Sequence, residues 1–220
     1  MNNHLITKSV KLCLYGLMTV CVINIFSNFM QINLMNEYFV KDLYPEDVFG
    51  VLADKNDSRV AIVDSLYLIF LISSWFVIGR WFFVSAKINH LSGIKELKFS
   101  PGWSVGWYFI PFANLVMPYR SLKETFKASF NSEEWQNNKV PYDFPIWWAT
   151  FLIASWLGNI SFRMYLELGE TYTYEQLNQI SYIDIVTDVL FIVNAIFLLR
   201  IVNIIFHNQK DKNFKLHEEN

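Results

Sequence analysis

Three aspartates and one arginine lie in or beside long apolar stretches of the sequence, where a charge is costly and is often functional. They are Asp64, Arg163, Asp184 and Asp188. Asp184 and Asp188 are four residues apart, so they share one face if their segment is helical. Carboxylates grouped in apolar surroundings can bind a proton or a cation. The alternative is a structural ion pair, in which Arg163 neutralises one of the carboxylates.

The stretches that carry these residues are long enough to cross a membrane. The chain is 53% hydrophobic and 18% aromatic, with mean hydropathy +0.24, whereas soluble domains are about 45–50% apolar. Because a spanning helix needs about 20 mostly apolar residues, we predict an all-α membrane protein with one domain, residues 1–220. Its four predicted spans are 10–32, 60–86, 145–166 and 181–206.

The first span has two interpretations. Lys8 and Lys11 precede an uncharged run at 12–36, which also fits a signal peptide. No alanine occurs before Ala53, however, and signal-peptide cleavage needs small residues. We therefore predict an uncleaved span. The acid-rich segment 33–59 that follows is expected to form one or two short amphipathic helices on the membrane surface or an ordered loop.

Basic residues are unevenly distributed among the connecting segments. The segment 33–59 carries three, and 167–180 carries none. The segment 87–144 carries Lys87, Lys95, Lys98, Arg120, Lys123, Lys127 and Lys139. The positive-inside rule therefore places 87–144 and both termini in the cytoplasm, with the four spans paired into two helix hairpins.

Two of the spans share a charge spacing. Asp64 and Arg80 are separated by the same interval as Asp184 and Arg200. One hypothesis is an internal repeat about an axis along the membrane normal; the other is coincidence. Arg80 and Arg200 each lie about six residues, roughly 9 Å, from the inner end of their spans. A long side chain at that depth can reach lipid phosphate, and the alternative is a role in binding a substrate.

The central stretch 101–118 is apolar and aromatic but is interrupted by prolines. These are Pro101, Pro111 and Pro118. If the stretch crossed the membrane, its basic flanks would fall on opposite sides, and backbone groups freed by proline would face lipid. We therefore predict a re-entrant or interfacial segment, with a helix that starts at Ser100 and ends near Ile110. An interfacial amphipathic helix is predicted at 118–130.

This stretch also carries a recognisable order of residue types: Pro-Gly-Trp, an aromatic run, Pro-x-x-Asn-Leu and Pro-Tyr. The residues are Pro101, Gly102, Trp103, Gly106, Trp107, Pro111, Asn114, Leu115, Pro118, Tyr119 and Arg120. The pattern resembles a bacterial membrane family, the domain of unknown function 4328. The resemblance covers about 60–206 and does not reach the acidic segment 33–59. It implies a multi-pass protein of the bacterial inner membrane, and it implies no activity.

Three residues of the pattern each allow a structural and a functional interpretation. Gly102 and Gly106 have the GxxxG spacing that lets another backbone approach closely, or they only make room for neighbouring tryptophans. Asn114 follows the proline-broken helix. It could line a cavity at membrane depth, or it could hydrogen-bond backbone groups that Pro111 leaves free.

Several functional classes receive no support from the sequence. The net charge of −2 offers no basic surplus for nucleic acid. The four histidines lie in tails or loops without ligand spacing, so we predict no metal and no cofactor. No hydrolase or phosphate-loop motif occurs. We therefore assign no catalytic residue, and an enzyme is the least favoured class.

Three functions remain open. The leading hypothesis is a non-enzymatic membrane component that binds lipid or a protein partner through the central stretch and the basic helix after it. The second is a small transporter or channel subunit, which needs a homo-oligomer or another membrane protein because four helices form a narrow bundle. The third is an intramembrane enzyme that modifies lipid.

Overall fold

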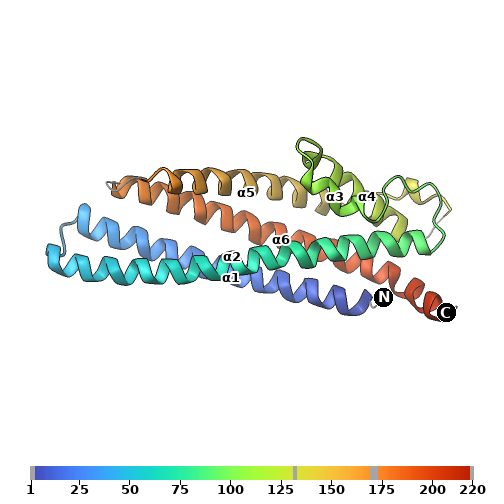
Figure 1. The fold of residues 1–220 in the computed structure, drawn as a ribbon, viewed down its shortest axis with the longest axis horizontal. Helices are drawn as coiled ribbons and strands as arrows, with labels where there is room; N and C mark the ends of the chain where they lie inside the picture. Colours follow the sequence, from blue (N-terminus) through green and yellow to red (C-terminus); the bar gives the residue numbers. More distant parts are fainter. Residues whose placement is uncertain (1–2, 131–132, 169–172, 219–220) are drawn as a thin grey trace. The chain divides into compact units, whose positions relative to one another are not determined.

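The computed structural model describes residues 3–130, 133–168 and 173–218, with side chains described as far as Lys210. The described residues form helices and no strand. Four of the helices are long: α1 Asn3–Phe39, α2 Glu46–Leu91, α5 Asp143–Leu166 and α6 Tyr174–Glu218 (Figure 1). The all-α class is therefore as predicted.

Three helices are long and apolar enough to cross a membrane. They are α1, α2 and the part of α6 from Tyr174 to Lys210. The remaining long helix, α5, covers the predicted span 145–166, with Pro145 in its first turn. Proline is suited to that position because the first helical N–H groups have no partner within the helix.

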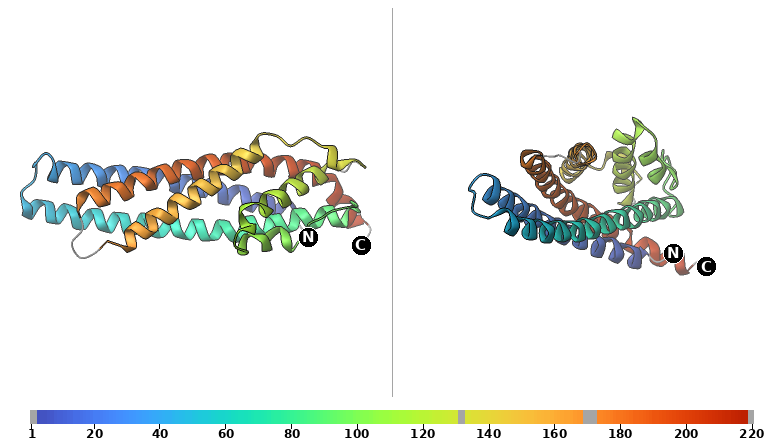
Figure 2. Two further views of the ribbon diagram at one scale, coloured as in Figure 1. Left: turned by 90° about the horizontal axis from the view of Figure 1, so that it is seen from above. Right: turned by 60° about the vertical axis from the view of Figure 1, so that its left-hand side comes forward.

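The segment 33–59 differs from the prediction. Helix α1 continues to Phe39 and α2 already begins at Glu46, so only 40–45 separates them; the turn joins the blue and cyan helices in Figure 2. Contacts between the two helix ends hold this arrangement. The rings of Tyr38 and Phe49 stack at 3.6 Å, and the Tyr44 hydroxyl donates to Glu37 over 2.8 Å. Helix stability comes mostly from such tertiary packing, which a count of charged residues does not reveal.

The chain divides into two compact units, and each of the four long helices contributes a part to both. Unit 1 consists of Met1–Tyr15, Ile72–Ala149 and Asn194–Asn220. Unit 2 consists of Gly16–Leu71 and Thr150–Val193.

The core of unit 1 is formed by large side chains that are almost completely buried. They include Trp81, Phe144, Ile88, Ile201 and Ile205. Trp81 has no exposed surface, and its indole N–H donates to the hydroxyl of Thr7 over 3.1 Å. The hydrogen bond matters because a buried indole N–H without a partner costs free energy.

The central stretch is helical from Trp103 to Phe109 and leaves the helix at Ile110, close to the predicted helix from Ser100 to about Ile110, although its second half is 3-10 helix. It contains α3 Trp103–Gly106, the 3-10 helices η1 Trp107–Phe109 and η2 Ala113–Leu115, and then α4 Met117–Ser129. Trp103 and Trp107 are four residues apart on this helical run, and their ring centroids lie 4.6 Å apart. Helix α4 lies within one residue of the predicted helix 118–130 at each end.

The apolar face of α4 packs against the same chain within unit 1. Leu122 and Phe126 are buried, and the Phe126 ring lies 4.9 Å from that of Phe144. The side-chain amide of Asn89 donates to the Thr125 carbonyl over 2.8 Å. This face is therefore occupied by protein.

The loop between α2 and α3 is bound to α4 by one carboxylate. Glu124 accepts hydrogen bonds from the backbone N–H groups of Lys98 and Phe99, at 2.9 and 3.0 Å. We expect Glu124→Gln to weaken this attachment by about 1–2 kcal/mol, because hydrogen bonds to a charged group are the stronger ones. Trypsin should then cleave after Lys98 faster than in the wild type. The matched control is Glu46→Gln, at an exposed site remote in sequence, and equal cleavage in both variants would contradict the prediction.

Candidate functional site

Unit 2 contains a group of polar side chains between helices. We call it the polar core of unit 2. Its members are Cys21, Asn24, Gln31 and the backbone carbonyl of Ser27 on α1, Asn56, Arg59 and Tyr67 on α2, Ser161 on α5, and Ser181, Asp184 and Asp188 on α6. The α1 members follow three- and four-residue spacing, so they share one face of the helix. Helical periodicity therefore accounts for their alignment.

Asp188 is the most buried acid of this group, with 1% of its surface exposed. The side-chain amide of Asn24 donates to its Oδ2 over 3.0 Å. The thiol of Cys21, which is fully buried, lies beside this carboxylate. Both partners are uncharged groups on α1. A carboxylate that is removed from water without a countercharge is costly, so Asp188 is the member most in need of a neutralising ligand.

The other two aspartates lie nearer the surface. Asp184 is half-buried and accepts a short hydrogen bond from the hydroxyl of Ser161. Asp64 is exposed and interacts electrostatically with both Asp184 and Asp188. The structure thus brings together the three acids singled out in the sequence.

Arg163 does not form the predicted alternative, an ion pair with one of these aspartates. Its side chain is exposed, and among the described residues the one salt bridge joins Arg200 to Asp143, with 3.3 Å between Nη1 and Oδ1. Among the described residues, no arginine or lysine forms a salt bridge with Asp64, Asp184 or Asp188. Nor do any three histidine, cysteine, aspartate or glutamate side chains in the described part of the chain group closely enough to hold a metal ion.

A cation of unit 2 that the sequence analysis missed is Arg59. Its Nη2 donates to Oδ1 of Asn56 over 2.6 Å and to the Ser27 carbonyl over 3.0 Å. The amide of Asn56 in turn donates to Gln31, and Gln31 donates to Ser181 over 3.0 Å. Arg59 was assigned to a loop. The signal that could have found it is the spacing of three residues from Asn56, which is helical.

The remaining charged candidates lie in unit 1. Arg80 is exposed, and Arg200 pairs with Asp143 while its guanidinium lies 5.5 Å from the Phe197 ring centre. Both side chains are therefore at the surface of the chain.

The glycines and Asn114 of the central stretch are also in unit 1. A Cβ added to Gly106 would lie 3.0 Å from the Trp103 ring, whereas one added to Gly102 would meet nothing within 4 Å. Gly106 thus makes room for a tryptophan. Asn114 is half-buried, and its backbone N–H donates to the Ile110 carbonyl over 2.9 Å.

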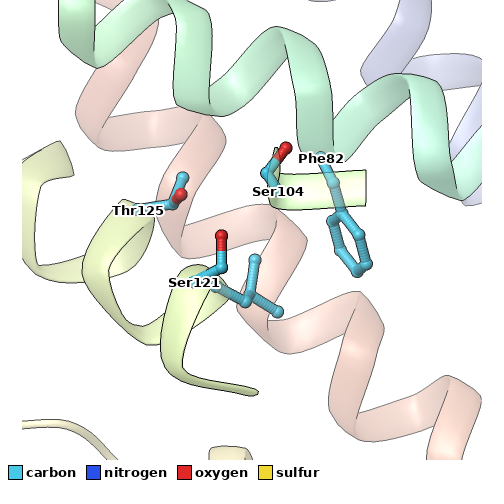
Figure 3. A pocket seen from close by; sticks show the side chains of 5 residues that line it. Phe82, Ser104, Ser121 and Thr125 are labelled. Atoms are coloured by element: carbon cyan, nitrogen blue, oxygen red, sulfur yellow. The ribbon is translucent and has the colours of Figure 1, made fainter. Parts of the chain in front are cut away.

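A second polar group in unit 1 is shown in Figure 3. The side chains of Ser104, Ser121 and Thr125, with Phe82 and Leu122, line one narrow space on α2, α3 and α4. The hydroxyl of Ser121 is buried without a hydrogen-bond partner. The space among these side chains is too narrow for a water molecule, so it cannot accept a ligand in this conformation.

Most of the chain matches a known protein family. Residues 46–206 match the model of the family described as domain of unknown function (DUF4328). The chain belongs to the DUF4328 family. No curated protein and no solved structure matches it. The family match begins at residue 46, so it includes part of the acid-rich segment that the resemblance did not reach.

Membership of DUF4328 relates both groups of candidate residues to one family domain. The matched range contains the proline-rich motif, which is in unit 1, and also Asp64, Asp184 and Asp188, which are in unit 2. The α1 partners of Asp188, Cys21 and Asn24, precede the matched range. This DUF4328 protein has apolar helices long enough to cross a membrane, which indicate a membrane protein, and its family has no described activity.

Proposed function

We propose that this DUF4328 protein is a small proton-coupled transport component of the membrane, with Asp188 as its proton site. The observation that carries the proposal is the burial of this carboxylate, 1% exposed, against the uncharged groups of Asn24 and Cys21. Ionisable groups within apolar helices are functional candidates by default. A bound proton removes the cost of the buried charge, and its release recreates that cost, which couples proton binding to a change in the helices.

The rest of the polar core of unit 2 supports movement of a proton to and from this site. From Cys21 to Gln31 the α1 members extend over about 15 Å at the helical rise. Ser161 with Asp184, and Gln31 with Ser181, supply further hydrogen-bonding groups from α5 and α6. Proton relays in membrane proteins are chains of ionisable groups, and Asp184 is the second carboxylate of this core that can take up and release a proton.

We further propose four spans paired as two hairpins, with both termini in the cytoplasm of a bacterial inner membrane. The fourth span is α5, whose residues 144–162 carry no charge. Apolar side chains on α5 are exposed, including Trp156 at 66% and Phe162 at 60%, as expected for a lipid-facing surface. Because four helices enclose little space, the transport unit is a homo-oligomer.

Helix α4, the basic helix of the lipid- or partner-binding hypothesis, has less free surface than the sequence indicated. The apolar face of α4 is covered within unit 1. The Lys127 ammonium donates to the Gln136 carbonyl, and the Lys123 ammonium lies 5.9 Å from the Tyr119 ring centre. Arg120 remains exposed. These contacts favour the proton site over α4 as the carrier of function.

The test is proton movement into liposomes that contain the purified protein and a pH-sensitive dye. Under an imposed pH gradient, the wild type should exceed protein-free liposomes, and Asp188→Asn should fall to their level. The matched control is Asp54→Asn, which changes an exposed acid on α2 and should retain wild-type flux. Infrared difference spectra should also show a protonated-carboxyl band that Asp188→Asn lacks. Wild-type flux in Asp188→Asn, or no flux in the wild type, would reject the proposal.

A further inference from the structure

The segment from the end of η1 to the start of α4 exposes large apolar side chains. Phe109 is 82% exposed and Phe112 is 87% exposed, while Leu115 and Val116 are 50% and 44% exposed. We call these four residues the aromatic tip. A phenylalanine left this open to water forgoes most of the free energy that its burial would supply. Two of them in one turn therefore indicate contact with an apolar phase.

The backbone of the tip is held in a conformation that bulky residues rarely adopt. Phe112 has a φ angle of +63°, which is a true outlier for a side chain of this size and requires support from its surroundings. One support is the indole N–H of Trp148, which donates to the Leu115 carbonyl over 2.9 Å. The strained turn therefore presents Phe112 outward.

The backbone N–H groups that follow Phe112 are hydrogen-bonded within the same segment. Backbone N–H groups of Ala113, Asn114, Leu115 and Val116 donate to carbonyls at distances of 2.7–3.3 Å. Backbone groups without partners are what exclude irregular segments from lipid. The tip can thus enter an apolar phase at less cost than an open loop.

A cation directly follows the tip. Arg120, in the first turn of α4, is exposed. Trp103 and Trp107, whose rings form a tilted pair, belong to α3 and η1, and both of these elements contact α4. Apolar side chains in the acyl region, tryptophans at the interface and a cation at the phosphates make up the arrangement of interfacial membrane anchors.

We propose that the aromatic tip inserts into one leaflet of the bilayer that surrounds the protein, with Arg120 on an anionic lipid phosphate. The occupant is lipid, because this chain already carries helices able to span a membrane and because the exposed charge beside the tip complements a phosphate. Insertion is shallow, since the segment turns back into α4 within a few residues.

The depth of the tip can be measured in nanodiscs with the full-length protein. The native Cys13 and Cys21 are replaced by serine and alanine, and one cysteine carrying an environment-sensitive dye is introduced at Phe112. The control site is Glu133, which is also exposed but lies in the polar segment well before the proposed span on α5. Lipids spin-labelled near the headgroup should quench the dye at 112 strongly and the dye at 133 weakly.

Either of two results would overturn the insertion. The dye at 112 could report water, as at 133, or it could report an apolar site that spin-labelled lipid does not quench, which would mean contact with protein. A second arm tests the cation. Native mass spectrometry should show that Arg120→Gln lowers the retention of anionic relative to zwitterionic lipid about fivefold, the effect of one cation near a membrane surface. Unchanged retention would remove Arg120 from the proposal.

Discussion

Replacement of Trp81 by alanine is expected to lower the free energy of unfolding by about 3–5 kcal/mol. The side chain has no exposed surface in unit 1, so its loss leaves a cavity in the core. Its removal also leaves the Thr7 hydroxyl without the indole N–H that it accepts over 3.1 Å. The measurement is equilibrium unfolding in mixed micelles, followed by near-UV circular dichroism.

Helix α2 supplies a matched control for this experiment. Trp75 lies on the same helix in the same unit and is 64% exposed. Trp75→Ala should cost less than about 1 kcal/mol, as is usual for surface positions. If the two alanine variants had equal stability, Trp81 would not be a core residue of unit 1.

The second large effect concerns the pair of Asn24 and Asp188. We expect Asn24→Leu to destabilise the protein by about 2–3 kcal/mol, because it removes a hydrogen bond to a buried carboxylate. Asp188→Leu alone should also destabilise, by leaving the amide of Asn24 without an acceptor. The double variant should recover most of the loss, since replacing both partners by apolar groups of similar shape is close to neutral.

This double-mutant cycle separates stability from function. The double variant should fold with nearly wild-type stability and yet show no proton movement in liposomes, because the proton site is gone. The coupling free energy between the two positions is read from unfolding of the four proteins under identical conditions. Additive single-variant losses would contradict the hydrogen bond as the basis of the pair, and flux in the stable double variant would contradict Asp188 as the proton site.

The long helices and the break before α4 were predictable from the sequence, because both depend on local composition. Apolar runs of sufficient length located the long helices, because hydrophobic length and the absence of charge are properties of a segment by itself. The prolines located the break before α4 for the same reason, since proline removes a backbone donor wherever it occurs. The order of residue types around Pro101 and Pro111 also identified the family.

The assignment of 33–59 to surface helices or a loop was wrong for a physical reason. Its charged residues are compatible with helix, and what extends α1 to Phe39 and begins α2 at Glu46 is contact between the two helix ends, such as the stacking of Tyr38 on Phe49. Such contacts join residues of different segments. They are absent from any count made along one segment.

The amino-acid sequence was sufficient to identify an all-helical DUF4328 protein with apolar helices and three acids in unusual surroundings. Which groups these acids contact depends on how the helices pack. This packing placed Asn24 and Cys21 on Asp188, left Arg163 exposed, and made Arg59 part of the polar core of unit 2. Helical periodicity states which residues share a face, whereas the partner of a face depends on how helices distant in the chain pack together.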